Sequence, residues 1–126
     1  MTILLDITVP GKPHPLMRAR SGNGRHYDPS ENVGAKNKIQ LFSRWSGPPT
    51  TAAVHIQIAC HYMRATPTAD VDNLAKTVLD ALNNYVLKDD RQVISLHVYK
   101  RGSCVRDETL ITVTEIAEFP DDDEAT

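Results

Sequence analysis

The densest group of chemically reactive side chains lies between residues 70 and 90. Asp70 and Asp72 are two residues apart where an extended stretch passes into an amphipathic segment, so their carboxylates can converge at the first turn of a helix. Mg²⁺ prefers hard oxygen ligands, and proteins usually hold it through one or two carboxylates while water and substrate phosphate complete its shell. The pair is therefore a candidate magnesium site.

Further side chains nearby in the sequence could complete such a site. Lys76 follows Asp72 by one helical turn on the same face, where its ammonium could meet a phosphate beside the metal. Asp89 or Asp90, just before the next expected strand, could return to the same end of the sheet and supply another oxygen ligand. Asp80 stands one turn after Lys76 and could orient that lysine.

A structural interpretation of the same residues stays open. Aspartate at a helix N-terminus is an ordinary cap, and acids one turn away from a lysine form ordinary helical ion pairs. Adjacent aspartates also suit a turn. Spacing alone does not decide between a metal site and these structural roles.

Basic side chains gather in the first part of the chain. Between residues 10 and 46 there are seven Lys and Arg against two acids, whereas the last twelve residues hold six acids and no base. This polarity suits a nucleic-acid partner, and it is equally compatible with a solvated face and a solubilising tail. The candidate DNA-backbone contacts are Lys12, Arg18, Arg20, Arg25, Lys36 and Lys38.

The hydrophobic periodicity predicts the elements that must position these residues. Alternating apolar residues indicate strands over 3–9 and 54–60, β-branched runs indicate strands over 93–100 and 110–116, and residues 10–29 are expected to form a loop or an irregular hairpin. Helices are expected over 29–45, with Asp28 as its cap, and over 70–85. The order β-α-β-α-β-β predicts an α/β (α+β) two-layer fold, with one mixed four-stranded sheet, two helices and an antiparallel last pair of strands.

Length and composition indicate one domain. The chain has 126 residues, of which 1–119 are expected to form the domain and 120–126 an acidic, disordered tail. No apolar run approaches the roughly 20 residues that cross a bilayer, so no membrane partner is expected. With no basic flank at its N-terminus and no metal-type spacing of its two cysteines, the chain is expected in the cytoplasm.

One stretch of the chain resembles a known family. The signature of the RusA Holliday-junction resolvases is closely similar to Asp-Val-Asp-Asn-Leu-Ala-Lys-Thr-Val-Leu-Asp-Ala-Leu-Asn-Asn, followed here by Lys-Asp-Asp-Arg-Gln-Val. Every position of the family pattern is filled between Asp70 and Val93. A looser similarity to the phage branch covers Gly11-Lys12-Pro13, Arg18-x-Arg20 and Tyr27-Asp28-Pro29.

The resemblance implies a function. It implies a crossover junction endodeoxyribonuclease of phage or prophage origin, acting on four-way DNA as a homodimer in recombination and repair. Mg²⁺, for which Mn²⁺ could substitute, would be held by Asp70, Asp72 and Asp90, with Lys76 assisting catalysis. Beside this implied site, Asp80 could support Lys76 or form a plain surface pair, and Asp89 could be a turn residue or a second metal ligand. The alternative is a protein that binds junctions or forks with little or no cleavage.

Overall fold

Four long strands and two helices carry the fold, in a computed structural model that describes residues 2–18, 20–22, 25–27 and 29–116. The predicted acidic tail lies outside the described residues. The elements follow in the order β1 (Thr2–Pro10), β2 (Arg20–Gly22), β3 (Arg25–Tyr27), α1 (Ser30–Ser43), β4 (Val54–His61), α2 (Val71–Leu82), η1 (Asp90–Gln92), β5 (Val93–Arg101) and β6 (Glu108–Glu115). No helix within the described ranges is long and apolar enough to cross a membrane.

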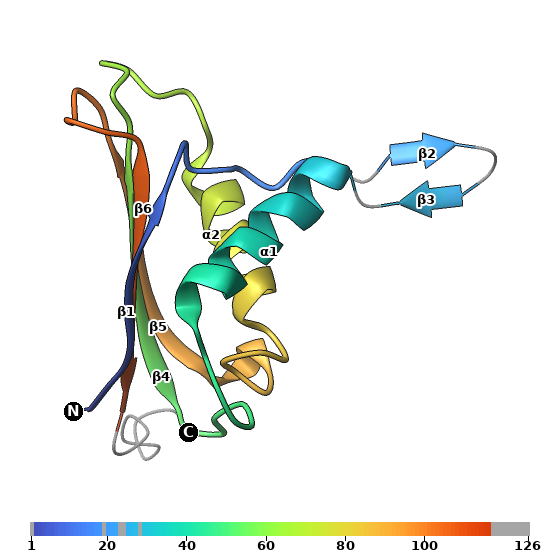
Figure 1. Ribbon diagram of the computed structural model, residues 1–126, viewed down its shortest axis with the longest axis vertical. Helices are drawn as coiled ribbons and strands as arrows, with labels where there is room; N and C mark the ends of the chain where they lie inside the picture. Colours follow the sequence, from blue (N-terminus) through green and yellow to red (C-terminus); the bar gives the residue numbers. More distant parts are fainter. Residues whose placement is uncertain (1, 19, 23–24, 28, 117–126) are drawn as a thin grey trace, which may run out of the picture.

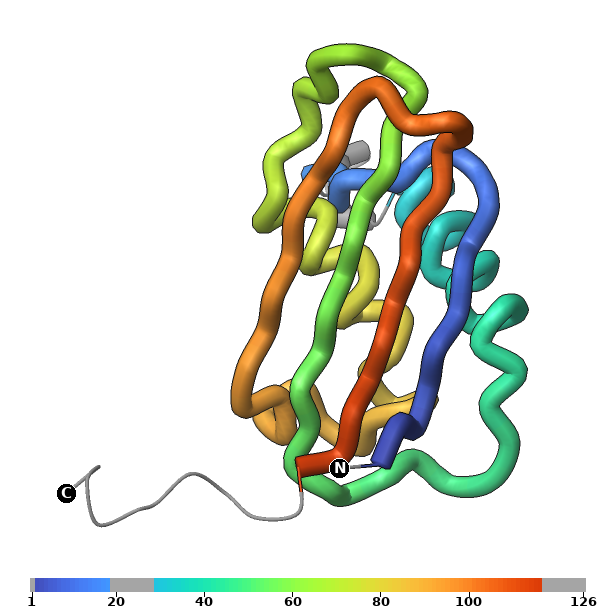
Figure 2. Tube along the Cα trace, turned by 90° about the vertical axis from the view of Figure 1, so that its left-hand side faces the viewer, coloured from blue at the N-terminus to red at the C-terminus, as the bar shows by residue number. Residues whose placement is uncertain are grey.

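The strands form the mixed sheet that the sequence predicts, in the order β1-β6-β4-β5. Strand β5 runs parallel to β4, whereas β6 is antiparallel to both β1 and β4 (Figure 2). The prediction that the last two strands pair with each other is wrong, because β4 lies between them. Strand β4 is buried along most of its length and takes two neighbours, while the more exposed β5 is left at an edge.

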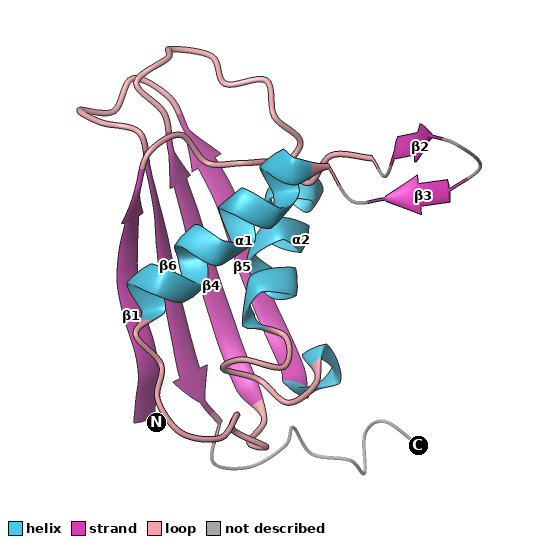
Figure 3. Cartoon of the chain, turned by 45° about the vertical axis from the view of Figure 1, so that its right-hand side comes forward, coloured by secondary structure: helices cyan, strands magenta, loops and turns pink. Residues whose placement is uncertain are grey.

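Both helices pack on one face of the sheet (Figures 1 and 3). This arrangement confirms the two-layer α+β fold. The core between the layers is aliphatic, and each fully buried aliphatic side chain contributes about 1.5–3 kcal/mol. Its fully buried members include Ile56, Ile58, Leu74, Val78, Leu82, Ile111 and Val113.

Helix α2 has the amphipathic pattern expected of it. Its buried positions include Leu74, Val78 and Leu82, which face the sheet, while Asp72, Lys76 and Asp80 are exposed. The helix ends at Leu82, and the backbone turns into the left-handed conformation two residues later, at Asn84, with φ of 60°.

Helix α1 and the segment before it differ in detail from expectation. The helix is shorter than predicted at both ends, and Pro29 precedes its first residue instead of occupying it. Asp28, the expected cap, lies outside the described residues. Of the two forms expected for residues 10–29, the hairpin is present, since β2 and β3 pair antiparallel and project beyond α1 (Figure 1).

The direction of α2 separates the two ends of the sheet. Because β4 and β5 are parallel, the helix that connects them must run back from the carboxyl end of β4 to the amino end of β5. Residues before α2 and residues after it therefore lie at opposite ends of the domain (Figure 3).

Candidate active site

Asp70 and Asp72 lie where α2 begins, at the carboxyl end of β4. Asp70 is extended and immediately precedes the helix, yet its side chain makes no capping hydrogen bond to the backbone. Both carboxylates are exposed, and neither forms a hydrogen bond or an ion pair with any described side chain. Their oxygens are therefore available to a ligand.

Lys76 presents its ammonium one turn further along the same helix. It is exposed, and it forms no ion pair with Asp72 or with Asp80 among the described residues. The ordinary helical pairs that a structural interpretation predicts are thus not made. Asp80 does not hold Lys76 in this structure, so its orienting role stays a prediction.

Lys100 was not among the residues predicted from the sequence, yet it holds the backbone directly before Asp70 in place. Its Nζ donates a hydrogen bond of 2.7 Å to the carbonyl oxygen of Ala69, directly before Asp70. This contact ties the start of α2 to the end of β5. A lysine on the helix-covered face of a strand was the available signal, because a charged side chain at a half-buried position needs a polar partner.

Residues 12–18 form a strap that lies across the start of α2. The backbone N–H of Leu16 donates to the carbonyl oxygen of Asn73 at 2.9 Å, and the Tyr62 hydroxyl donates to the carbonyl oxygen of Pro13 at 3.3 Å. A cleft of about 330 Å³ separates part of this strap from the residues before Asp70 and is lined by Lys12, Pro13, His14, Pro15, Tyr62, Thr68 and Ala69. The strap therefore brings Lys12 to a cleft bordered by Ala69, the residue directly before Asp70.

Asn32, fully buried in α1, anchors the strap from the other side. Its amide Nδ2 donates to the carbonyl oxygen of Met17, and its Oδ1 accepts from the Met17 N–H, both at 3.0 Å. The same Oδ1 lies 2.8 Å from Nε2 of His14. Because Oδ1 can only accept, Nε2 of His14 carries the proton in this arrangement.

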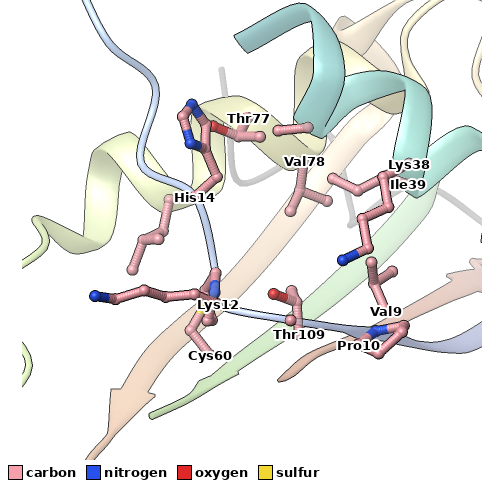
Figure 4. A pocket seen from close by; sticks show the side chains of 14 residues that line it. Val9, Pro10, Lys12, His14, Lys38, Ile39, Cys60, Thr77, Val78 and Thr109 are labelled. Atoms are coloured by element: carbon pink, nitrogen blue, oxygen red, sulfur yellow. The ribbon is translucent and has the colours of Figure 1, made fainter. Parts of the chain in front are cut away.

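The remaining predicted DNA contacts are spread over the strap, hairpin and α1. Lys12 lines the cleft described above, and Lys38 extends from α1 so that its Nζ lies against Gly11 (Figure 4). Arg18 is exposed at the end of the strap, and Lys36 is half-buried in α1. In the hairpin, the backbones of Arg20 and Arg25 are described, and their side chains lie outside the description.

Asp90 lies far from the acidic pair within one chain. It begins the short helix η1 before β5, and the seven steps from Val93 to Lys100 span roughly 23 Å of strand. The expectation that this aspartate returns to the end of the sheet occupied by Asp70 is wrong for a single chain, because β4 and β5 are parallel. Within the described ranges, no three His, Cys, Asp or Glu side chains are close enough to hold a metal ion.

Asp89 caps the same short helix. Its Oδ1 accepts from the Arg91 N–H at 2.9 Å and its Oδ2 from the Arg91 guanidinium, and these hydrogen bonds lower the pKa of the Asp89 carboxyl. Gln92 completes a capping box on Asp89 and donates to the carbonyl oxygens of Thr50 and Ala52. These contacts fix the turn that presents Asp90.

Comparison with known proteins places this site in a family. Residues 8–114 match the family of endodeoxyribonuclease RusA, a range that includes both helices and the whole stretch from Asp70 to Asp90. The chain is also 53% identical to the uncharacterized protein YqaN of Bacillus subtilis (strain 168), over 76% of this chain and 86% of the relative. The chain therefore belongs to the RusA endodeoxyribonuclease family, which confirms the resemblance seen in its sequence.

Proposed function

We propose that this protein is a divalent-metal-dependent endonuclease that resolves four-way DNA junctions by paired, symmetric nicks. Besides the family membership, one structural observation supports this proposal. Asp70 and Asp72 expose two carboxylates that have no partner among the described residues, beside Lys76 and near the strap that carries Lys12. A surface that gathers unpaired acids next to cations suits a metal ion and a phosphate, whereas simple DNA binding gains nothing from the acids.

The donor set at the start of α2 fits Mg²⁺ or Mn²⁺. Two carboxylates are the usual protein share of a magnesium site, and the phosphate and water supply the other oxygens. When bound, the ion would polarise the scissile phosphate and activate a water molecule. Lys76 would neutralise charge that develops on the phosphate, and Lys12 would hold the neighbouring backbone from the strap.

We include a homodimer in this proposal, formed through the edge of β5. In the described part of the chain β5 pairs only with β4, and from Val93 to Tyr99 it carries no proline, Lys, Arg, Asp or Glu. Proteins usually protect such an edge, as Asp6 and Pro10 do on β1 at the other side of the sheet. Two-fold pairing of β5 with a second copy would satisfy the exposed backbone groups.

This pairing offers a way to unite the aspartates of the family signature. Strands related by a two-fold axis pair antiparallel, so the beginning of one β5 lies beside the end of the other. Asp90 of the partner subunit would then approach the residues next to Lys100, including Asp70. The dimer would contain two such sites, which suits paired nicks in a junction that is itself two-fold symmetric.

Cleavage of a labelled four-way junction tests the proposal. We expect nicks that require Mg²⁺ and are abolished by EDTA, and Asp72→Asn should lower the rate by about 10²–10³ while junction binding is retained. Asp6→Asn removes an exposed acid from β1, at the opposite edge of the sheet, and should cut at a nearly normal rate. Rapid cleavage by Asp72→Asn would contradict the proposal, and tight binding without cutting by the native chain would favour a junction-binding protein.

The setting of this activity is part of the proposal. DNA recombination and repair take place in the cytoplasm of a bacterial cell, and the similarity of residues 11–13, 18–20 and 27–29 to the phage branch supports a phage or prophage origin. The family membership supports nuclease chemistry in either case.

A further inference from the structure

Two loops meet beyond the carboxyl ends of β4 and β5, on the side of the domain that holds the acidic pair. We call residues 62–66 and 101–107 together the arginine tip; both loops stand at the top of Figures 1 and 2. Four hydrogen bonds join them, and the first runs from the Tyr62 N–H to the Arg101 carbonyl oxygen at 2.9 Å. The Ser103 N–H donates to the Arg64 carbonyl oxygen at 2.9 Å, the Cys104 N–H to that of Tyr62 at 2.9 Å, and the Met63 N–H to Oδ1 of Asp107 at 2.7 Å.

The contact between the loops is close enough to make the tip a preorganised unit. A Cβ on Gly102 would clash with the backbone carbonyl groups of Arg64 and Ala65, so only glycine permits this approach. The carbonyl oxygen of Asp107 also accepts from the Gly11 N–H at 3.1 Å, which ties the tip to the beginning of the strap. Because the loops are already held in place, little backbone conformational entropy would be lost when a ligand binds.

The arginine tip carries three positively charged side chains on its surface. Arg64, Arg101 and Arg106 are all exposed, and none of them forms an ion pair or a side-chain hydrogen bond within the described ranges. The one acid of the tip, Asp107, already accepts the Met63 N–H. Guanidinium groups offer planar donor pairs that match phosphate oxygens, so the unused donors point to a phosphate-bearing ligand.

Exposed apolar side chains stand beside these arginines. Val105 is 87% exposed next to Arg106, and Met63 is 60% exposed next to Arg64. Single exposed apolar residues are ordinary, but here one stands on each braced loop, adjacent to an unpaired arginine. Proteins that kink DNA use this combination, with apolar side chains against unstacked bases and cations on the flanking phosphates.

We infer that the arginine tip is a second DNA contact, which binds the point where the arms of a branched substrate meet. Arg64 and Arg106 contact backbone phosphates, and Val105 and Met63 pack against bases that are unstacked there. The six residues from Arg64 to Asp70 span at most about 21 Å, or about six base-pair steps, so one substrate can reach both sites. This inference rests on the proposed function and names how its substrate is recognised.

Junction binding in EDTA tests the charged part of the tip without cleavage. The double variant Arg64→Gln/Arg106→Gln should weaken binding of the full-length protein at least tenfold and reduce the slope of log K against log salt by about 2. Arg44→Gln, an exposed arginine at the end of α1, removes a charge away from the tip and serves as the control. Unchanged affinity and slope in the double variant, with circular dichroism showing native folding, would overturn the inference.

A second variant tests the apolar part. Val105→Ser should leave binding to a linear duplex unchanged, weaken junction binding severalfold, and reduce the fluorescence rise of a 2-aminopurine placed at the branch point. An unchanged fluorescence rise with unchanged junction preference would overturn base contact by the tip. If the native protein binds junctions without cutting them, the nuclease proposal fails while the tip is still tested by these binding measurements.

Discussion

Aspartates of this chain differ in role because their surroundings differ. Asp89 is held by hydrogen bonds from Arg91 that lower its pKa, so its contribution to the turn is present at neutral pH and is lost as the pH falls through that lowered pKa. Asp70 and Asp72 have no such partners in the part of the chain that the structure describes. The first kind of carboxylate already has hydrogen-bond partners in the fold, whereas the second kind is the one that we propose binds a metal ion.

Cysteine reactivity provides a residue-scale test of the core. Cys60 is buried in β4, and burial raises its pKa to about 12, so almost no thiolate exists at pH 8. We expect a maleimide to modify the partly exposed Cys104 in the native protein and to spare Cys60, as measured by peptide mass spectrometry. Labelling in guanidinium chloride, where both should react, is the control. Equal native rates at the two thiols would contradict the packing of β4.

At the scale of elements, the strap shows how a segment without regular structure can be held in place. Residues 12–18 have no apolar period, and they are fixed by hydrogen bonds to both helices. The fully buried Asn32 satisfies both backbone groups of the half-buried Met17. This arrangement sets the distance between the basic strap and the acidic start of α2.

Replacing Asn32 should therefore loosen the strap. Asn32→Ala leaves the part-buried backbone groups of Met17 without the partner they have here, so the free energy of unfolding in urea should fall by about 1–3 kcal/mol. Amide exchange at Met17 should accelerate, and junction affinity should decrease. Asn37→Ala, at an exposed asparagine of the same helix, should change none of these quantities. A variant of Asn32 with native stability and native exchange at Met17 would show that the strap is held by other contacts.

Within one protomer, the two halves of the proposed site lie at opposite ends of the sheet. A single chain cannot bring Asp90 to Asp70, since the length of β5 lies between them. Antiparallel pairing of two β5 edges would place these ends together. The sheet direction that separates the aspartates within one protomer would thus bring them together across a two-fold axis.

Mixed dimers test this arrangement directly. Asp72→Asn and Asp90→Asn should each be inactive alone, because every site loses one ligand. After the two variants are refolded together, half of the dimers are mixed and each mixed dimer regains one intact site, so nicking should return to about a quarter of the native level. Refolding each variant with itself is the control. No recovery in verified mixed dimers would exclude a shared site and leave the role of Asp72 standing.

Local patterns in the sequence determined the elements and the acidic pair. The period of α2 fixes which of its side chains are buried, and with it the outward position of Asp72 and Lys76. The family signature was visible for the same reason, since it lies within one helix and the turn that follows. The hairpin between 10 and 29 was foreseen only as one of two forms, because that stretch has no apolar period.

Only the tertiary structure decided how distant segments meet. It inserted β4 between β5 and β6, anchored the strap on Asn32, joined the loops of the arginine tip and placed Asp90 away from Asp70. Periodicity reports which face of an element is buried, and it carries no information about which strand becomes its neighbour. Strand order depends instead on how the whole apolar surface is shared between the layers, and that order settles which residues reach the same end of the sheet.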